Sequence, residues 1–440
     1  MNSDAPFANR RLHFVGIGGC GMSGLALVAH SLGAHVSGSD QKESIFTGSL
    51  RRHGVTDIAL GHRPEQVPPS PAEVVYTGAT SATIEVETAR EREQVCLHRS
   101  ELLAELTGAH RTIAVGGAHG KSSTTALLAH VLAACGTDPS YVVGALLRPP
   151  GEHAATGMGG SLVIEADESD GSLLRYRVDT AVVTNVDLDH VGEAGGYREV
   201  GDVATVLGRF AATARAAVAS GQAAEHLAGL VPHLVVVEPE LIADQPTRFQ
   251  LDGQLYEVNQ PGAHQLRNAA LVVQVARAEG CAPDAIRAAL LSFPGLARRF
   301  ELRGKTARGA RVIDDYAHHP VEVAAALATA RASTEGRVLA VFQPHLFTRT
   351  EQFLTEFLDA LAAADRAWIE PVYPARQNPA DYPQVTARLE QEAGARGELL
   401  GMSPGRGQLA ALLAASAEPG DVVMLIGAGD VTQLADLLVV

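Results

Sequence analysis

The sequence contains little lysine, cysteine or tryptophan, and it has no long apolar run. Three lysines, four cysteines and one tryptophan occur among 440 residues. No apolar run reaches the roughly 18 residues of a membrane-spanning helix, so we expect no membrane insertion. The N-terminal segment MNSDAPFANRR also lacks the apolar stretch of a secretory signal, which predicts a cytoplasmic protein.

The cysteines and the net charge argue against further classes of site. Cysteines at widely separated positions, with no CxxC pair, indicate neither a zinc site nor a disulfide framework. They are Cys20, Cys96, Cys135 and Cys281. The formal charge of −15 makes extended contact with a phosphate backbone unfavourable, and no basic run with interleaved aromatic residues is present. We therefore expect no nucleic-acid partner, while nothing in the sequence indicates an oligomeric state.

Apolar β-like runs alternate with alanine-rich helical stretches along the chain, which predicts an α/β fold with parallel sheets covered by helices. Because domains commonly contain roughly 100 to 200 residues, we expect three of them. Their predicted ranges are 1–108, 109–296 and 297–440. The expected strands lie at residues 12–15, 34–37, 73–77, 111–115, 161–164, 180–184, 311–313, 338–342, 367–369 and 422–426, with a helix at 124–135.

A first glycine loop, Gly16-Ile-Gly-Gly-Cys-Gly21, directly follows the first expected strand. Asp40 lies about 20 residues further on, at the end of the next strand, as in an NAD-binding fingerprint. Such glycines let backbone amides approach a pyrophosphate, whichever nucleotide carries it. The short stretch between Asp40 and a second phosphate loop leaves little room for a full dinucleotide domain. The loop therefore predicts binding of a nucleotide diphosphate, with an NAD-dependent dehydrogenase or a ligand-free tight turn as alternatives.

The second loop, Gly116-Gly-Ala-His-Gly-Lys-Ser-Ser123, lies between an expected strand and an expected helix. It is a shortened form of the phosphate loop G-x-x-x-x-G-K-[ST]. Gly117 and Gly120 permit close approach of the backbone to phosphates. Lys121 can reach the β- and γ-phosphates of ATP, and Ser122 can bind Mg²⁺. The alternatives are a P-loop kinase and a glycine turn with an exposed lysine.

Two acidic clusters directly follow expected strands, Glu165-Ala-Asp-Glu-Ser-Asp170 and Asn185-Val-Asp-Leu-Asp-His190. In open parallel sheets, ligands gather at the carboxyl ends of the strands, so both clusters should converge on the second loop. Mg²⁺ takes few protein carboxylates, so one or two of these acids suffice as ligands and the others are surface residues.

Six segments, in order along nearly the whole chain, resemble the motif series of the Mur ligases. They are HFVGIGGCGMSG at 13–24, GGAHGKSS at 116–123, EADESD at 165–170, TNVDLDH at 184–190, DDYAHHP at 314–320 and FQPHLFTRT at 342–350. Within this family, the series is most similar to the branch that joins L-alanine to UDP-N-acetylmuramate.

The resemblance implies an N-terminal Rossmann-like domain for the UDP-sugar, a central P-loop ATPase domain, and a C-terminal Rossmann-like domain that contributes to the amino-acid and adenosine sites. It also implies an ATP- and Mg²⁺-dependent ligase of peptidoglycan precursor synthesis that works through an acyl phosphate. A recycling ligase that attaches a preformed peptide and a non-catalytic UDP-sugar-binding protein are further alternatives.

Matched position by position, the resemblance assigns site residues in five groups. The UDP-sugar group is Gly16, Gly18, Gly19, Gly21, Met22, Ser23 and Asp40. The ATP group is Gly117, Ala118, His119, Gly120, Lys121, Ser122, Ser123, His264, Asn268, Asp315 and Arg299, with Arg298 as the alternative arginine. The metal group is Ser122, Glu165 and His190, and the amino-acid group is Tyr316, His345, Arg349 and Arg376. The catalytic group is Lys121, His190, His318, His345 and Arg349.

Some positions depart from the family pattern. Gln265 stands where asparagine is common, and Leu346 stands where many members have a second arginine, for which Arg376 is a possible substitute. No lysine occurs between Ser122 and Gly304, so we expect no carbamoylated lysine of the kind that bridges a metal in related ligases.

Overall fold

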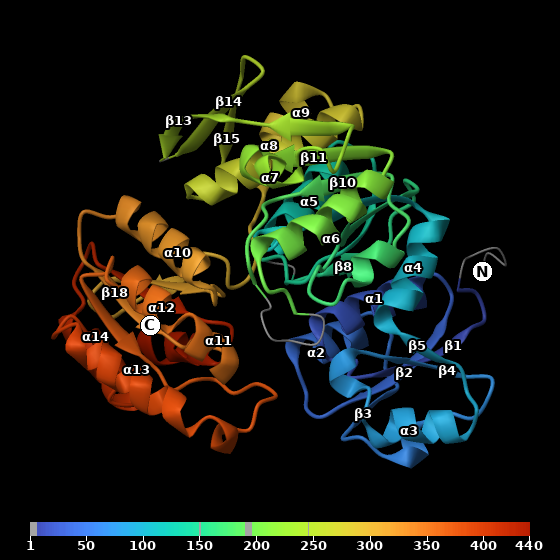
Figure 1. Ribbon diagram of the computed structural model, residues 1–440, viewed down its shortest axis with the longest axis horizontal. Coiled ribbons are helices and arrows are strands. Elements are labelled where there is room, and N and C mark those ends of the chain that lie inside the picture. The colour runs from blue at the N-terminus through green and yellow to red at the C-terminus, as the bar shows by residue number, and fades with distance from the viewer. Residues whose placement is uncertain (1–6, 149–150, 190–195, 245) are drawn as a thin grey trace. The chain divides into compact units, whose positions relative to one another are not determined.

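The computed structural model describes residues 7–148, 151–189, 196–244 and 246–440 (Figure 1). The chain forms two compact units. The first unit contains residues 1–238 and 267–294, and the second contains residues 239–266 and 295–440. No helix among the described residues is long and apolar enough to cross a membrane.

The first unit begins with a parallel five-stranded sheet in the order β3-β2-β1-β4-β5. Its strands are β1 (Arg11–Val15), β2 (His35–Asp40), β3 (Ile58–Leu60), β4 (Glu73–Tyr76) and β5 (Cys96–His98), and its helices are α1 (Cys20–Ser31), α2 (Ile45–Arg52), α3 (Ile84–Glu91) and α4 (Arg99–Ala109). Because the strand order reverses between β1 and β4, a crevice is expected at the carboxyl ends of these two strands.

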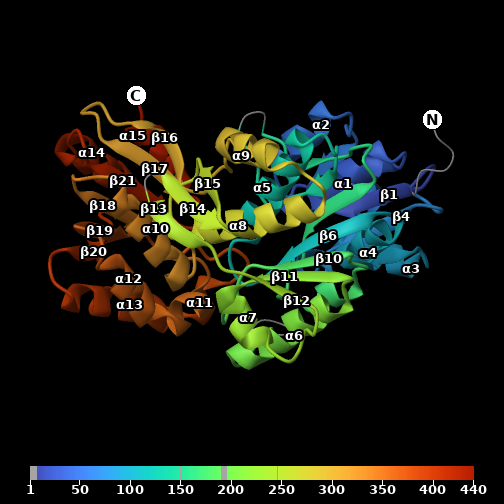
Figure 2. The same cartoon turned by 90° about the horizontal axis from the view of Figure 1, so that it is seen from above.

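The second sheet of this unit has the order β12-β11-β10-β6-β9-β7-β8. Its strands are β6 (Arg111–Gly116), β7 (Ser140–Val142), β8 (Ala154–Ala155), β9 (Ser161–Glu165), β10 (Thr180–Val183), β11 (Ala216–Ser220) and β12 (Leu234–Val237). Its helices are α5 (Lys121–Ala134), α6 (Val200–Thr213), α7 (Gly221–Leu227), α8 (Ala263–Ala278) from Arg267 on, and α9 (Pro283–Ser292). Figure 2 shows α6 and α7 beside β11 and β12. Strand β6 lies between β9 and β10, so the loop after β6 has an acidic cluster on each side.

The two sheets of the first unit share a buried core, which explains why they form one unit. Helix α1 packs against the β7–β8 hairpin. A Cβ atom on Gly24 would lie 2.8 Å from Val142 Cγ1, so only glycine allows this approach.

The second unit contains the antiparallel strands β13 (Glu240–Asp244), β14 (Thr247–Leu251) and β15 (Gln254–Val258). It also contains a six-stranded sheet in the order β16-β17-β21-β18-β19-β20. These strands are β16 (Glu301–Lys305), β17 (Arg311–Asp315), β18 (Val338–Phe342), β19 (Arg366–Ile369), β20 (Leu400–Met402) and β21 (Val422–Ile426). The helices are α10 (Pro320–Ala332), α11 (Phe347–Gln352), α12 (Leu354–Leu361), α13 (Pro383–Ala395), α14 (Arg406–Ser416) and α15 (Ala435–Leu438).

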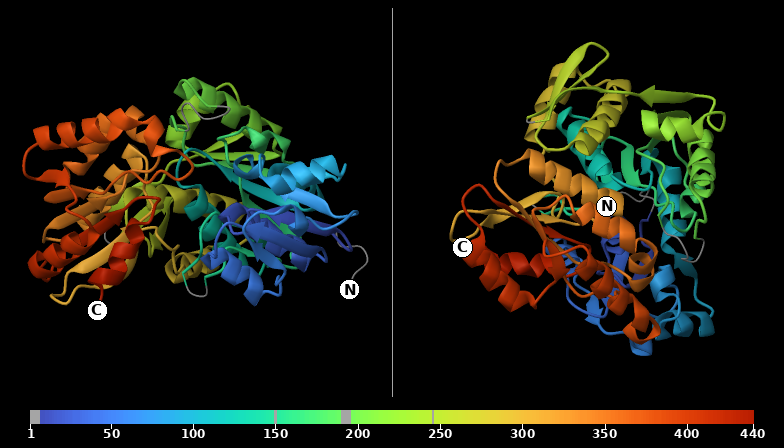
Figure 3. Two further views of the ribbon diagram at one scale, coloured as in Figure 1. Left: turned by 90° about the horizontal axis from the view of Figure 1, so that it is seen from below. Right: turned by 60° about the vertical axis from the view of Figure 1, so that its left-hand side comes forward.

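Helices cover both faces of the six-stranded sheet (Figure 3). Successive residues of its apolar strands point to opposite faces, so each face contributes to a buried apolar cluster. Ala340 and Phe342 of β18 belong to one buried cluster, whereas Leu339 and Val341 belong to another. Continuous apolar strands of this kind are typical of a buried parallel sheet.

The α/β fold class is confirmed, and each strand expected from the sequence is present within two residues of its predicted ends, except that β2 ends three residues later than predicted, at Asp40. The expected helix at 124–135 begins earlier, at Lys121, so the phosphate loop leads directly into it. Strands β3, β5, β7, β8, β11 to β16 and β20 were not foreseen, and they include the antiparallel strands β13 to β15. The domain ranges 1–108, 109–296 and 297–440 stay predictions, since the contacts group the chain into two units.

Candidate active site

The first glycine loop connects β1 to α1 in a conformation that requires glycine. Gly16 has φ +80°, and a Cβ atom there would lie 2.9 Å from Thr80 Cγ2. The backbone N–H of Gly16 donates to the Ser39 carbonyl at 2.8 Å, and that of Gly18 donates to Asp40 Oδ2 at 2.8 Å. Strand β2 and Asp40 therefore hold the loop in place.

Ser39 is itself held by a buried polar network beneath the loop. Its hydroxyl donates to Glu85 Oε2 at 2.5 Å, and His62 Nδ1 lies 2.8 Å from the same oxygen. Burial is the largest single effect on Glu85 and would raise its pKa, but the interactions with His13, Ser39 and His62 together lower that pKa below its ordinary value. The carboxylate is thus kept ionised inside the first sheet.

A cavity of about 400 Å³ lies at the carboxyl ends of β1 and β4, at the expected reversal of strand order. One wall consists of the first glycine loop with residues after β4 and β5. The other consists of residues at the ends of β7 and β9, namely 142–144, Ile164, Glu165 and Asp167. Of the predicted UDP-sugar residues, the following line it: Gly16, Gly19, Gly21, Met22 and Asp40. One cavity therefore joins the glycine loop to the first acidic cluster.

Ser23 has a different environment from the other predicted UDP-sugar residues. It is fully buried, and its hydroxyl donates to the Cys20 carbonyl at 2.9 Å. The same oxygen lies 2.7 Å from Nε2 of His153, a buried residue just before β8. Burial lowers the pKa of His153 to about 4, so its ring is neutral at pH 7. Ser23 therefore links α1 to the β7–β8 hairpin behind the loop, and its role in binding stays a prediction.

The phosphate loop is fixed by residues that follow β10. Gly117 and Gly120 have φ +127° and +80°, and a Cβ atom on Gly117 would collide with Thr184. Asn185 Oδ1 accepts from the backbone N–H of His119 at 2.9 Å, and its Nδ2 donates to the His119 carbonyl at 2.7 Å. The side chain of Asn185 therefore holds both the backbone N–H and the backbone carbonyl of His119.

Lys121 lies at the start of α5 with its ammonium over the loop. Its Nζ donates to the carbonyls of Gly117 at 2.7 Å and Ala118 at 3.1 Å, and to Glu168 Oε2 at 2.8 Å. Burial alone would lower the pKa of Lys121, but the carboxylates of Glu168, Asp167 and Glu165 together raise it above its ordinary value. The lysine is therefore a fixed cation.

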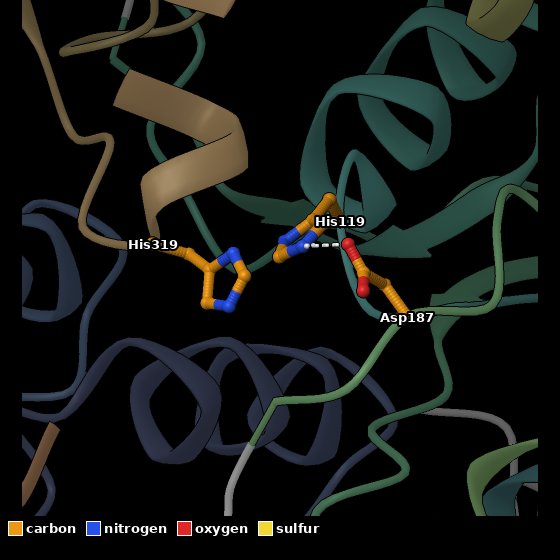
Figure 4. Close-up of side chains that lie close together, drawn as sticks. All are labelled: His119, Asp187 and His319. Atoms are coloured by element: carbon orange, nitrogen blue, oxygen red, sulfur yellow. Dashed lines mark ion pairs between the residues drawn. The ribbon is translucent and has the colours of Figure 1, made fainter. Parts of the chain in front are cut away.

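The predicted convergence of both acidic clusters on the phosphate loop is confirmed. From the first cluster, Glu168 pairs with Lys121, and Glu165 accepts from the backbone N–H of Gly144. From the second cluster, Asp187 Oδ2 lies 3.4 Å from Nε2 of His119 in the loop (Figure 4). Ser122 and Glu165 remain predicted metal ligands, whereas the predicted ligand and catalytic residue His190 lies outside the described residues.

The predicted adenosine residues of α8 lie in its first turns. Asn268 lies beside the phosphate loop, since a Cβ atom on Gly120 would be 3.0 Å from Asn268 Oδ1. His264 precedes Asn268 by one helical turn, on the same side of the helix. Gln265, the position that departs from the family pattern, directly follows His264 in α8.

The predicted residues of the second unit gather where β17, β18 and β19 end. The ring of His318 lies 5.4 Å from that of Tyr316 and 6.2 Å from that of His345, which stacks on Tyr373 at 5.7 Å. The guanidinium groups of Arg298 and Arg299 lie 5.0 Å and 5.2 Å from the centre of the Tyr316 ring. Cations at these distances are attracted to an aromatic face.

Asp315, at the end of β17, is a buried carboxyl group. Its oxygens accept from the backbone N–H groups of Phe300 and Ala317, each at 2.8 Å. Burial raises its pKa to about 6, against the opposing effect of Arg299 and these two hydrogen bonds. This group therefore titrates close to neutral pH.

Arg349 and Arg376, the predicted contacts of the amino-acid carboxylate, differ in exposure. Arg349 lies within α11 and is 8% exposed, whereas Arg376 lies in an exposed turn after β19. Leu346, directly before α11, is 3% exposed and has φ +68°, which is unusual for a residue with a side chain. Gln377 Oε1 accepts from the N–H of Phe347 at 2.6 Å and so holds the start of the helix.

Several residues of the site were not singled out from the sequence. Glu168 lies within a motif of several acids, so its pairing with Lys121 depends on the fold. Asn185 belongs to a recognised motif, although its role in the loop was not foreseen. Arg99 lines the cavity, and its only sequence signal is its place directly after a strand of the first sheet.

Comparisons with known proteins agree with this geometry. The family description "Mur ligase family, catalytic domain" matches residues 11–111, and "Mur ligase, glutamate ligase domain" matches residues 298–429. A UDP-N-acetylmuramate–L-alanine ligase from Renibacterium salmoninarum is 40% identical over 448 residues, covering 96% of this chain and 94% of that protein.

Two solved structures of related ligases share the fold of this chain. The crystal structure of the UDP-N-acetylmuramate-alanine ligase from Thermotoga maritima has a TM-score of 0.80 and 25% identity, with 97% of both chains covered. A murein peptide ligase from Psychrobacter arcticus shares the fold, with a TM-score of 0.71 and 20% identity over 97% of both chains. From the similarity in sequence over nearly its full length, we conclude that the chain belongs to the Mur ligase family.

Proposed function

We propose that this chain joins L-alanine to the carboxylate of UDP-N-acetylmuramate, driven by ATP, in the synthesis of a peptidoglycan precursor. The observation that carries the proposal is the single cavity that extends from the glycine loop to Glu165 and Asp167 beside the phosphate loop. A substrate that carries a diphosphate and, at the far end of the sugar attached to it, a carboxylate fits this arrangement. The full-length similarity to an alanine ligase supports this pair of substrates. Because the reaction consumes ATP and a UDP-sugar, we also propose a cytoplasmic location.

The chemistry of the phosphate loop fits ATP together with Mg²⁺. The carboxylates of Glu165, Asp167 and Glu168 all act on the one ammonium of Lys121, which leaves an excess of negative charge that a divalent cation would offset. Ser122 and Glu165 offer oxygen ligands of the kind Mg²⁺ prefers, and His190 is the third proposed ligand. When bound, the ion would neutralise charge on the phosphate oxygens.

The first step makes the substrate carboxylate reactive. One of its oxygens attacks the γ-phosphorus of ATP in line, the bond to the β-phosphate oxygen breaks, and ADP leaves. Lys121 is placed to donate to the transferred phosphoryl group, because its ammonium already lies over the loop carbonyls. The product of this step is an acyl phosphate.

The second step forms the amide bond. The neutral amine of alanine attacks the acyl carbon, and the tetrahedral oxyanion collapses with loss of inorganic phosphate. A base must take the proton from the amine. His318 and His345 are the proposed candidates, since both lie at the carboxyl ends of the six-stranded sheet where its ligands are expected.

Mass spectrometry of the product tests the proposal and separates it from the recycling reaction. The purified chain is incubated with ATP, Mg²⁺ and UDP-N-acetylmuramate, together with either L-alanine or a preformed peptide that begins with alanine. We expect a UDP-N-acetylmuramyl-alanine product in the first mixture and little product in the second. A product formed only with the peptide would assign the chain to recycling instead.

A further inference from the structure

The cavity beside the first glycine loop has an uneven distribution of charge. Among the described residues that line it, Arg99 is the one with a cationic side chain. The other charged lining residues are Asp40, Glu165 and Asp167, all of them carboxylates. Arg99 begins α4, and Leu103, one turn later on the same side of the helix, also lines the cavity. Helix α4 therefore presents a guanidinium and an apolar side chain to this space.

Arg99 differs from neighbouring arginines because the described residues give it no ion pair and no hydrogen bond. Arg10, directly before β1, pairs with Glu73 at 2.6 Å, and Arg51 on α2 pairs with Glu43 at 2.6 Å. The proposed mechanism assigns a role to Lys121 but none to Arg99. A partly buried guanidinium that lines a cavity and has five N–H donors favours an anionic ligand there.

The guanidinium of Arg99 lies directly against the backbone of the first glycine loop. A Cβ atom on Gly21 would be 3.2 Å from Arg99 Nη1, so the missing side chain at this position gives the guanidinium room. The same wall of the cavity contains Gly16 and Gly19. Backbone amides of such loops and a guanidinium fork both bind phosphate oxygens, and here they lie side by side.

We propose that Arg99 binds the diphosphate of the UDP-sugar and holds it against the backbone at Gly19 and Gly21; this rests on the proposed function. Both nonbridging oxygens of a phosphate can accept from the fork of one guanidinium. The carboxylates of Asp40, Glu165 and Asp167 disfavour a diphosphate elsewhere in the cavity. Arg99 therefore sets the position of the substrate in the cavity as well as its affinity.

Calorimetric titration of Arg99→Ala and Arg99→Lys with three nucleotides tests the proposal. The probes are UDP, UDP-N-acetylglucosamine, which lacks the lactyl carboxylate, and UDP-N-acetylmuramate. We expect Arg99→Ala to weaken binding of all three by a similar factor, roughly 10- to 100-fold, because each carries the diphosphate. Arg99→Lys should recover part of the loss, since it keeps the charge without the fork.

Arg90→Ala is the matched control, because Arg90 is an exposed arginine of α3 that packs on Tyr76 of the same sheet and does not line the cavity. It should bind all three nucleotides like the native protein. The KM for ATP should stay unchanged in the Arg99 variants, and their unfolding temperatures should match the native value.

Two results overturn the assignment. If Arg99→Ala loses affinity for UDP-N-acetylmuramate alone, Arg99 contacts the lactyl carboxylate and not the diphosphate. If Arg99→Ala binds UDP with native affinity, Arg99 does not bind the diphosphate. If the native protein binds UDP through Arg99 but forms no alanine adduct, the proposed function is wrong while the role of Arg99 in diphosphate binding stands.

Discussion

Lys121 Nζ lies 2.8 Å from Glu168 Oε2, and Glu168 is almost completely buried. Lys121 begins α5 after β6, whereas Glu168 follows β9, the neighbouring strand. The pair therefore joins the phosphate loop to the first acidic cluster. Because the ammonium also contacts two loop carbonyls, it is positioned by the fold before any phosphate arrives.

Lys121→Ala should reduce kcat by about 100-fold or more, because a fixed cation that stabilises the transferred phosphoryl group is lost. Binding of UDP-N-acetylmuramate, measured by calorimetry, should stay near the native value, since that substrate is assigned to the first glycine loop. Lys305→Ala is the control, because Lys305 is an exposed lysine of β16. Loss of UDP-sugar affinity with ATP affinity intact would show that the two nucleotides are assigned to the wrong loops.

The chain should need no carbamoylated lysine. No lysine occurs between Ser122 and Gly304, so the second sheet and its loops offer no amine for this modification apart from Lys121, which is assigned to the phosphates of ATP. Intact mass measured with bicarbonate should show no adduct, and activity should not vary with the concentration of CO₂. A rate that rises with added bicarbonate would contradict this prediction.

Asp315 should make stability depend on pH. Burial raises its pKa from 3.8 to about 6, so the native state binds more protons than the unfolded state between these values. The free energy of unfolding should therefore fall as pH rises through this window, and Asp315→Asn should remove that part of the slope. Urea unfolding of both proteins between about pH 4 and pH 7 measures the difference. If the free energies of unfolding of the native protein and of Asp315→Asn change with pH in parallel, Asp315 has an ordinary pKa.

Arg349→Ala should raise the KM for alanine by roughly 10- to 100-fold, because a charge-assisted pair with the substrate carboxylate is lost. The KM for ATP should stay near its native value. Arg376→Ala is the informative comparison: Arg376 is exposed, and if Arg349 suffices alone, this variant behaves like the native protein. If ATP or UDP-sugar affinity falls in Arg349→Ala while alanine is unaffected, the arginine belongs to another site.

Alanine should be preferred to glycine and serine. Leu346 stands where many family members have an arginine, and its side chain is buried directly before α11. We expect it to keep the amino-acid pocket small and apolar, so the hydroxyl of serine would be buried without a partner. Equal values of kcat/KM for alanine and serine would show that Leu346 does not determine the choice of amino acid.

The sequence predicted the strands that carry the site because they are continuous apolar runs followed by polar motifs. Strand β6 and the loop after it are an example, since the strand lies in the sheet centre and is buried along its length after Arg111. Strands β13 and β15 were hard to predict because some of their apolar residues are exposed, although β14 alternates buried and more exposed residues. Leu241 and Leu255 are about half exposed, whereas Phe249 between them is fully buried.

Partners within the site were harder to predict than the site itself. Six acids in the two clusters could have paired with Lys121 on the sequence alone, and the choice of Glu168 follows from the turn after β9. Arg99 belongs to no motif, and its importance depends on the meeting of α4 with the first glycine loop. Such relationships are set by tertiary packing, which a local pattern does not contain.

Phosphate release from ATP tests the proposed function most directly. The native protein is assayed with Mg²⁺ and UDP-N-acetylmuramate, without an amino acid and then with L-alanine, glycine or L-serine. We predict that sustained release requires both UDP-N-acetylmuramate and an amino acid, and that it is fastest with L-alanine. Release at the same rate without UDP-N-acetylmuramate, or without any amino acid, would contradict a ligase that couples ATP to formation of the alanine amide.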